Sequence, residues 1–290
     1  MTLSFWTIQA LNALSFGTLL FLVAAGLSLI FGLMRIVNLA HGSFYMLGAY
    51  GALQVLTIVK NQLLATAIAV AFTAVLGAAI QRWLIERVSG NAMQQMLVTF
   101  GCLLVIGDLS LIAWHGTPAI LPVPDFLNGT AILPGGIHFP VLRLAIIALG
   151  VALVIALDQA QSRTSVGAMV RAGADDLEML SCLGVNVRTL FVCVFAFGAG
   201  LAGLGGALGG IFLGVAPGID LELGLYAFIV VIVGGLGSIR GTFVASLLVA
   251  FIDNFSKALF PAVSMFAIFL LLVVVIAIRP TGLFGRRALS

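Results

Sequence analysis

Charge is the scarcest property of this chain. Its 290 residues include 13 Lys or Arg and 10 Asp or Glu, which is 8% of the total, while 62% are hydrophobic. Soluble domains carry about 25% charged residues. This composition excludes an ordinary soluble domain and predicts an integral membrane protein. The net charge of +3 is small and the basic residues are dispersed, so we expect no nucleic-acid partner.

Motifs that carry chemistry are scarce too. The three cysteines form no CxxC pair, so the sequence predicts neither a disulfide framework nor a zinc site. His41, His115 and His138 are scattered, whereas a membrane-embedded enzyme needs a convergent nucleophile, base or metal set. The sequence also lacks a phosphate-binding loop ending in Gly-Lys-Ser/Thr. We therefore expect a chain that is not an enzyme, with no metal, cofactor or ATP site of its own.

Long apolar runs are what the chain has instead. Most have the length of about 17–25 residues that a helix needs to cross a bilayer, and none shows the alternating short strands of a transmembrane barrel. The predicted fold is all-α: one domain over residues 1–290, a polytopic transmembrane helical bundle of about nine spans. The range is eight to ten, because the seventh run is short and Gly-rich. The runs lie at 9–31, 42–59, 63–81, 95–114, 140–157, 189–213, 223–238, 242–260 and 263–279.

The distribution of Lys and Arg predicts the orientation. With the N-terminus outside, ten of the 13 basic residues, including Arg286 and Arg287, fall on the cytoplasmic side, and only Lys60, Arg143 and Lys257 fall outside. The C-terminus and residues 158–188 are then cytoplasmic, and the loop 115–139 is periplasmic. This loop is rich in Pro and Gly and contains the turn-forming pair at 128–129. We expect either a small ordered element there, such as a hairpin, or a plain connector.

Residues 158–188 form a charged segment between apolar runs, with seven charged side chains. Small and apolar residues recur there at spacings of four and three, which predicts one amphipathic helix over 165–184. Thr164 or Ser165 can cap its start and Gly184 can end it. A helix lying on lipid usually carries Lys and Arg on its polar face, but acids outnumber bases between 171 and 183, so a protein partner is favoured. The predicted stripe consists of Val166, Val170, Gly173, Leu177, Leu180 and Gly184.

Three motifs resemble those of a known family. Residues 167–186 are similar to the coupling loop of ABC importer permeases, and residues 26–50 resemble the first-span signature of LivH-type branched-chain amino acid permeases. Residues 234–241 fit the late Gly-rich motif of the same family. The Asn-Leu-Ala-His-Gly block at 38–42 is the most specific part. One departure is Ser43, where many members of the family carry an acid.

The resemblance implies a permease subunit that forms half of the translocation pathway of an ABC importer for branched-chain or related amino acids, in a bacterial inner membrane. It implies two cytoplasmic ATPase subunits that hold ATP-Mg, a second and different permease, and a periplasmic binding protein. Among the residues of the charged segment, those that we predict to couple to the ATPases are Gly167, Arg171, Ala172, Asp175, Asp176, Glu178 and Gly184.

Polar residues inside the apolar runs mark the candidate path. Asn38 and His41 either expose backbone beside the path or satisfy helix ends near water at the cytoplasmic end. Asp108 has no local partner, so it should face water or protein; it lines the outer half of the path or pairs with another helix. Asp253 precedes Lys257 by four residues, which predicts a structural ion pair. The residues that we predict to line the path are Asn38, His41, Gly42, Asp108, Gly237 and Ser238.

Two further patterns concern packing. Residues 38–48 and 235–245 are both small-residue and polar interruptions at a predicted cytoplasmic end, a pattern that accompanies internal duplication in transporters. Ala202, Gly206, Gly210 and Gly214 follow one another at four-residue steps, which allows close helix approach within the subunit or against a second permease.

Two alternative functions stay open. The first is a related ABC importer for urea, short amides or other small polar solutes, because the binding protein is expected to set most of the selectivity. The second is an ion-coupled secondary transporter, which needs several membrane-embedded ionisable groups; Asp108 is the strongest that the sequence offers.

Overall fold

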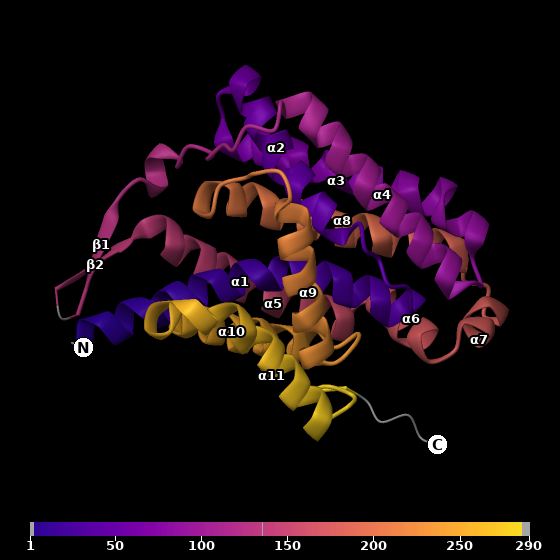
Figure 1. The fold of residues 1–290 in the computed structure, drawn as a ribbon. Helices are drawn as coiled ribbons and strands as arrows, with labels where there is room; N and C mark the ends of the chain where they lie inside the picture. Colours follow the sequence, from indigo (N-terminus) through magenta and orange to yellow (C-terminus); the bar gives the residue numbers. More distant parts are fainter. Residues whose placement is uncertain (1–2, 135, 286–290) are drawn as a thin grey trace.

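A long central helix organises the bundle. The computed structural model describes residues 3–134 and 136–285, and in it α1 (Leu3–Met34) is mostly buried by its neighbours. Figure 1 shows α1 running through the middle of the molecule. The helices that pack most extensively against it are α5 (Val141–Arg163), α8 (Val187–Phe212), α9 (Ile219–Gly234) and α10 (Ile239–Leu259).

The remaining helices form an outer layer. The helices α2 (His41–Val59) and α3 (Gln62–Trp83) pack against α8 and against each other, and α11 (Ser264–Ile278) covers α10. The helix α4 (Ala92–Trp114) is peripheral and contacts α2 and the short 3-10 helix η1 (Ile85–Val88). The last 3-10 turn, η3 (Pro261–Val263), joins α10 to α11.

Each predicted apolar run coincides with one of these helices. Seven of the described helices are long and apolar enough to cross a membrane, which supports a polytopic helical membrane protein. The helices α9 and α11 are shorter, with 16 and 15 residues. The seventh run ends earlier than predicted, at Gly234 rather than residue 238, because Gly235 and Gly237 adopt φ of +99° and +80°, which glycine reaches without strain. Arg286 and Arg287 lie outside the described residues.

The exception to the all-α prediction is a β-hairpin in the long loop. Strands β1 (Thr130–Leu133) and β2 (Ile137–Pro140) pair antiparallel and follow the 3-10 turn η2 (Asp125–Leu127). The loop therefore contains an ordered element, but its strands are joined after Leu133, where the amide of Gly136 donates to the carbonyl oxygen of Leu133 at 3.1 Å, rather than at the predicted 128–129. A backbone pair between Ala119 and Val215, with N–O distances of 2.7 and 2.8 Å, ties the loop to the α8–α9 connection.

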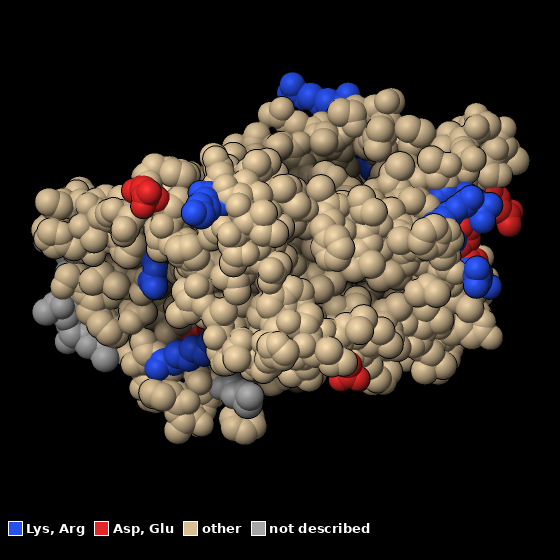
Figure 2. Space-filling model, turned by 90° about the horizontal axis from the view of Figure 1, so that it is seen from above, with Lys and Arg blue, Asp and Glu red and all other residues tan. Residues whose placement is uncertain are grey.

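The two ends of the bundle differ in what they carry. The hairpin and the start of α1 lie at one end, called here the hairpin end (Figure 1). The opposite end, called the α6 end, carries the short helices α6 (Ser165–Asp175) and α7 (Leu177–Cys182) (Figure 1). Figure 2 shows that charged side chains on one face gather mainly near the edges of the molecule, with broad uncharged surface between them.

Glycines set how closely α8 approaches its neighbours. A Cβ added at Gly26 of α1 would lie 2.4 Å from the carbonyl oxygen of Gly198 on α8, and one added at Gly48 of α2 would lie 2.2 Å from that of Gly203. Gly206, in the predicted small-residue stripe, lies in the same way against the backbone of Tyr45. The stripe therefore packs within this chain.

Candidate coupling surface and translocation path

The charged segment folds as two helices rather than one. At Asp176 the backbone is extended, with φ −151° and ψ 108°, and its carboxylate accepts hydrogen bonds from the amides of Glu178 and Met179 at 2.9 and 3.0 Å. The predicted single helix over 165–184 is wrong because an Asp that caps a new helix competes with continuation of the old one. The predicted cap at Thr164 is present: its hydroxyl accepts from the amide of Gly167 at 3.0 Å.

One side of this helix pair is held against the bundle. Val170, Gly173 and Leu180 are buried, as the predicted stripe requires, while Val166 is 53% exposed and does not join it. A Cβ on Gly173 would lie 2.8 Å from the side chain of Leu33 on α1. The helix α6 therefore rests directly on the last turns of the central helix.

The turn from α5 into α6 is tight. A Cβ on Gly167 would lie 2.4 Å from the carbonyl oxygens of both Ala160 and Gln161, so only glycine fits without a shift. The C-terminal boundary is equally specific, because Gly184 has φ of +83° and ends the segment as predicted. Gly167 and Gly184 thus act on the shape of the segment.

The other side of the helix pair is exposed and mixes acids with apolar groups. Ala172, Asp175, Asp176 and Glu178 are exposed. Beside them, Met179 and Leu183 are 65% and 73% exposed. Large exposed apolar side chains beside acids typically mark a protein-interaction surface.

Arg171 does not lie on this exposed surface. It is half-buried, and its Nη1 is buried without a hydrogen-bond partner among the described residues. Its side chain lines a cleft of about 1120 Å³ between α1, α5, α6, the Gly-rich turn (residues 234–238) and residues 280–285. Arg171, a predicted coupling residue, therefore faces the cleft at the α6 end and not the exposed surface of the helix pair.

This α6 cleft brings together two groups of residues that the sequence analysis treated separately. Arg171 and Asp175, predicted to couple, line it together with Gly237 and Ser238, predicted to line the path. Arg35, just after α1, reaches across and donates from Nη2 to the carbonyl oxygen of Ala174 at 3.1 Å. The coupling segment and the Gly-rich turn thus share one cavity.

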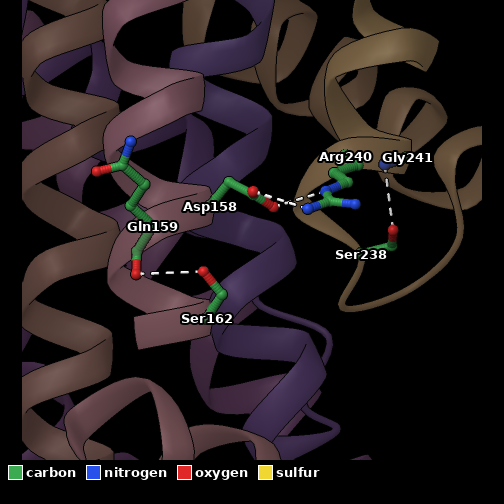
Figure 3. A network of polar contacts seen from close by, with 6 residues as sticks. All are labelled: Asp158, Gln159, Ser162, Ser238, Arg240 and Gly241. Atoms are coloured by element: carbon green, nitrogen blue, oxygen red, sulfur yellow. Dashed lines mark hydrogen bonds and ion pairs between the residues drawn. The ribbon is translucent and has the colours of Figure 1, made fainter. Parts of the chain in front are cut away.

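An ion pair joins the same two regions (Figure 3). Arg240, at the start of α10, donates from Nε and Nη2 to the two carboxylate oxygens of Asp158, near the end of α5, at 2.7 and 2.9 Å. Ser238 caps α10 by accepting from the amide of Gly241 at 3.1 Å (Figure 3). The Arg240 side chain is 72% exposed, so the pair contributes little to stability. Its bidentate geometry instead fixes where α10 begins relative to α5.

The Gly-rich turn also touches α1 directly. A Cβ on Gly32 would lie 2.7 Å from the Cα of Gly237, so the two backbones are in contact. The last turns of α1 therefore meet both α6, through Leu33 and Gly173, and the Gly-rich turn.

The start of α2 lies deeper in the bundle than predicted. Nε2 of His41 is 2.9 Å from the carbonyl oxygen of Val23, which precedes the end of α1 by eleven residues, or about 16 Å of helix. Residues 35–40 therefore run back along α1 before α2 begins. Asn38 and His41 are fully buried, so the structure does not place them at an exposed helix end, and their role in the path stays a prediction.

The connection between α1 and α2 is held by polar groups. The side-chain oxygen of Asn38 accepts from the amide of Ala40 at 3.1 Å. Thr99, from α4, donates to the carbonyl oxygen of Val37 and accepts from the amide of Leu39, both at 3.3 Å. Nδ2 of Asn38 and Nδ1 of His41 are buried without a partner among the described residues, so each retains unused hydrogen-bonding capacity.

Gly42 places α2 against α9. A Cβ there would lie 1.9 Å from the carbonyl oxygen of Asp220 and 3.0 Å from the Cα of Gly224. The hydroxyl of Ser43, the position that departs from the family pattern, donates to Oδ2 of Asp220 at 3.3 Å. The sequence analysis missed Asp220; the available signal was an acid at the entrance of an apolar run, two residues after Gly218.

Asp253 and Asp108, the two acids predicted to lie inside apolar runs, have different surroundings. Asp253 accepts from Nζ of Lys257 at 2.7 Å, which confirms the predicted ion pair, and also from the hydroxyl of Tyr226 at 2.9 Å. Asp108 is exposed on α4, opposite the face buried by Leu103 and Ile106. Within this chain it lines no interior, and its role in a path stays a prediction.

Comparisons with known proteins agree with this arrangement. The family described as branched-chain amino acid transport system / permease component matches residues 9–278. The chain is 28% identical to the high-affinity branched-chain amino acid transport system permease protein BraD of Pseudomonas aeruginosa, over 96% of this chain and 95% of that protein. It is 27% identical to the corresponding LivH of Escherichia coli K12, with the same coverage.

A solved structure shows a related fold. PsaBC from Streptococcus pneumoniae in complex with Fab aligns with 91% of this chain and 87% of that one, with a TM-score of 0.50 at 13% identity. The curated relatives are permease proteins, not enzymes, and they match along almost their whole length. The chain therefore belongs to the family of branched-chain amino acid transport system permease components.

Proposed function

We propose that this chain is the permease subunit of an ABC importer for branched-chain or related amino acids and forms half of its translocation pathway. The observation that carries the proposal is the helix pair α6–α7, which rests on α1 with one side and exposes acids and apolar side chains on the other. Such a pair can receive a partner's movement and pass it to the bundle.

The proposed partners are two cytoplasmic ATPase subunits, a second and different permease, and a periplasmic binding protein. ATP-Mg belongs to the ATPases. In a bacterial inner membrane, nine spans with the N-terminus outside place the α6 end in the cytoplasm and the hairpin end in the periplasm. The helices α9 and α11 then complete the count as short spans packed against α1 and α10.

The predicted coupling residues have different roles in this proposal. Ala172, Asp175 and Glu178 present the surface that meets the ATPase, and Asp176 holds α7 in place. Gly167 and Gly184 set the boundaries of the segment, as their contact and backbone angle require. The side chain of Arg171 lines the α6 cleft, so it responds to changes in the shape of the cleft. Movement of α6 then reaches α1 through Gly173 and reaches the Gly-rich turn through Asp158 and Arg240.

The outward face of α4 is the proposed boundary of the pathway with the second permease. Asp108 lies there between Leu104 and Ile112, which are 51% and 72% exposed. A carboxylate facing lipid costs about 2.5–3.5 kcal/mol on insertion scales. Water in the pathway or a group on the second permease removes that cost, which supports this placement of Asp108.

Reconstitution of the co-purified complex tests the function. We expect accumulation of leucine, isoleucine or valine in proteoliposomes that depends on ATP and on the binding protein, with ion gradients collapsed. Uptake of urea or short amides in place of amino acids would favour the first alternative. Uptake that follows an ion gradient after ATP removal would favour a secondary transporter and would overturn the proposal.

A further inference from the structure

A carboxylate lies buried between α2 and α9 without a cation. Asp220 is 4% exposed, and the described residues place no Lys, Arg or His within ion-pair distance of it. Among the residues that the structure describes, its one hydrogen bond to a side chain comes from Ser43 at 3.3 Å, which is long for an O–H···O bond. Buried charges in proteins are normally paired, and the other buried acid, Asp253, is paired with Lys257.

The surroundings of Asp220 show why it is tolerated without a cation. It stands in the first turn of α9, where free backbone amides and the helix dipole favour an anion. The start of α2 lies against the same turn, because Gly42 contacts the carbonyl oxygen of Asp220. Two helix N-termini and one acid therefore converge within the bundle, well away from either end of α1.

Besides α2 and α9, the peripheral helix α4 also lies beside the carboxylate of Asp220. A Cβ on Gly107 would lie 3.9 Å from Oδ2 of Asp220, so α4 offers no side chain at this point. Asp108, on the proposed pathway face, is the next residue. A small displacement of α4 from α9 would thus connect Asp220 to the pathway.

A second observation concerns the start of the same helix, α2. His41, the first residue of α2, is fully buried, and its Nδ1 has no partner among the described residues. The nearby Asn38 is also fully buried, with Nδ2 unpartnered. Buried polar groups are almost always hydrogen-bonded, so the start of α2 keeps donors or acceptors that this closed conformation does not use.

We propose that Asp220 and Ser43 form an intramembrane subsite for the ammonium group of the transported amino acid. The inference rests on the proposed function and names the residues that recognise its substrate. The carboxylate of Asp220 accepts hydrogen bonds from the ammonium, and the converging N-termini of α2 and α9 face the substrate carboxylate. The hydrogen bonds from the zwitterionic substrate thereby replace the weak hydrogen bond between Ser43 and Asp220. In this conformation the subsite is closed, because Gly42 lies against α9.

Uptake kinetics give the first test. In the full complex with its ATPases, second permease and binding protein, we expect Asp220→Asn to lower leucine uptake roughly 10- to 100-fold, since hydrogen bonds to charged groups are strong. ATP hydrolysis stimulated by the loaded binding protein should persist. Glu222→Gln is the matched control: Glu222 lies in the same turn of α9 but is exposed, and its variant should transport as the wild type does.

Thiol chemistry gives the second test. The three native cysteines are first replaced by Ala, and Ser43→Cys is introduced in that background. During turnover, cationic 2-aminoethyl methanethiosulfonate should modify the thiol several times faster than anionic 2-sulfonatoethyl methanethiosulfonate, after normalisation to a free thiol. Leucine should protect the thiol, and adding Asp220→Asn should remove the preference for the cationic reagent.

The outcomes separate the inference from the proposed function. A wild-type complex that shows no ATP-dependent transport of leucine, isoleucine or valine would overturn the proposed function itself. Wild-type transport that is unchanged in Asp220→Asn, or lowered equally in Glu222→Gln, would overturn the subsite alone. A thiol at position 43 that shows no charge preference, or that stays unreactive during turnover, would also overturn it.

Discussion

Substitution of Asp176 distinguishes two ways in which the α6–α7 pair can serve coupling: through the ordered structure of α7 or through the charge of Asp176. Its carboxylate accepts from two backbone amides at the start of α7, which is six residues long. A helix this short is not stable on its own. Removing an N-cap costs about 0.5–2 kcal/mol and typically about 1 kcal/mol, so Asp176→Ala should raise local opening of α7 by about fivefold at the typical cost.

The matched variant is Asp176→Asn, which keeps the acceptor oxygen and removes the charge. Hydrogen exchange of residues 177–182 should be faster in Asp176→Ala and near wild type in Asp176→Asn. Coupling, measured as substrate transported per ATP hydrolysed, should follow the same order. Both variants could lose coupling while only Asp176→Ala shows faster hydrogen exchange. Coupling would then depend on the charge of Asp176, and the reasoning that Asp176 serves coupling by capping α7 would be refuted.

Three further substitutions test the packing and the α6 end. Gly48→Ala should sharply lower the thermal stability of the detergent-solubilised complex, because its Cβ would meet α8 backbone, while Gly51→Ala on the same helix meets only an ordinary contact; equal melting temperatures would contradict the packing. Asp158→Asn should leave stability unchanged but lower transport per ATP, and the charge-swapped pair Asp158→Arg with Arg240→Asp should restore part of it; failure of the swap to restore any coupling would contradict the link. Arg171→Glu should uncouple transport without blocking membrane insertion, checked by membrane fractionation and ATP-driven uptake; full uptake would show that Arg171 is dispensable for coupling.

The sequence was sufficient for features that depend on local pattern. Long apolar runs predicted the helices, the i,i+4 spacing predicted the pair of Asp253 with Lys257, and Thr164 was one of the two residues predicted to cap the charged segment. These features are encoded by neighbours along the chain, so no tertiary contact was needed to find them. The break at Asp176 was missed because the apolar stripe continues across it with helical spacing, and the stripe conceals the competing cap.

Position within the bundle could not be predicted from the sequence for the start of α2. Asn38 and His41 look like interfacial residues because they follow Arg35 after an apolar run. Only the contact of His41 with Val23 shows that the chain turns back along α1. The meeting of Ser43 with Asp220, 177 residues apart, depends on the same reversal, which explains why Asp220 was not recognised.

The central helix connects the coupling surface to the proposed subsite. Leu33, in the last turn of α1, contacts α6 at Gly173, and the carbonyl of Val23 contacts His41 at the start of α2. Ten residues separate these points, or about 15 Å of helix. Because α1 is continuous from Leu3 to Met34, its two contacts must move together. If ATPases displace α6, as the proposed function requires, the displacement reaches the place where α2 meets Asp220 through one continuous helix.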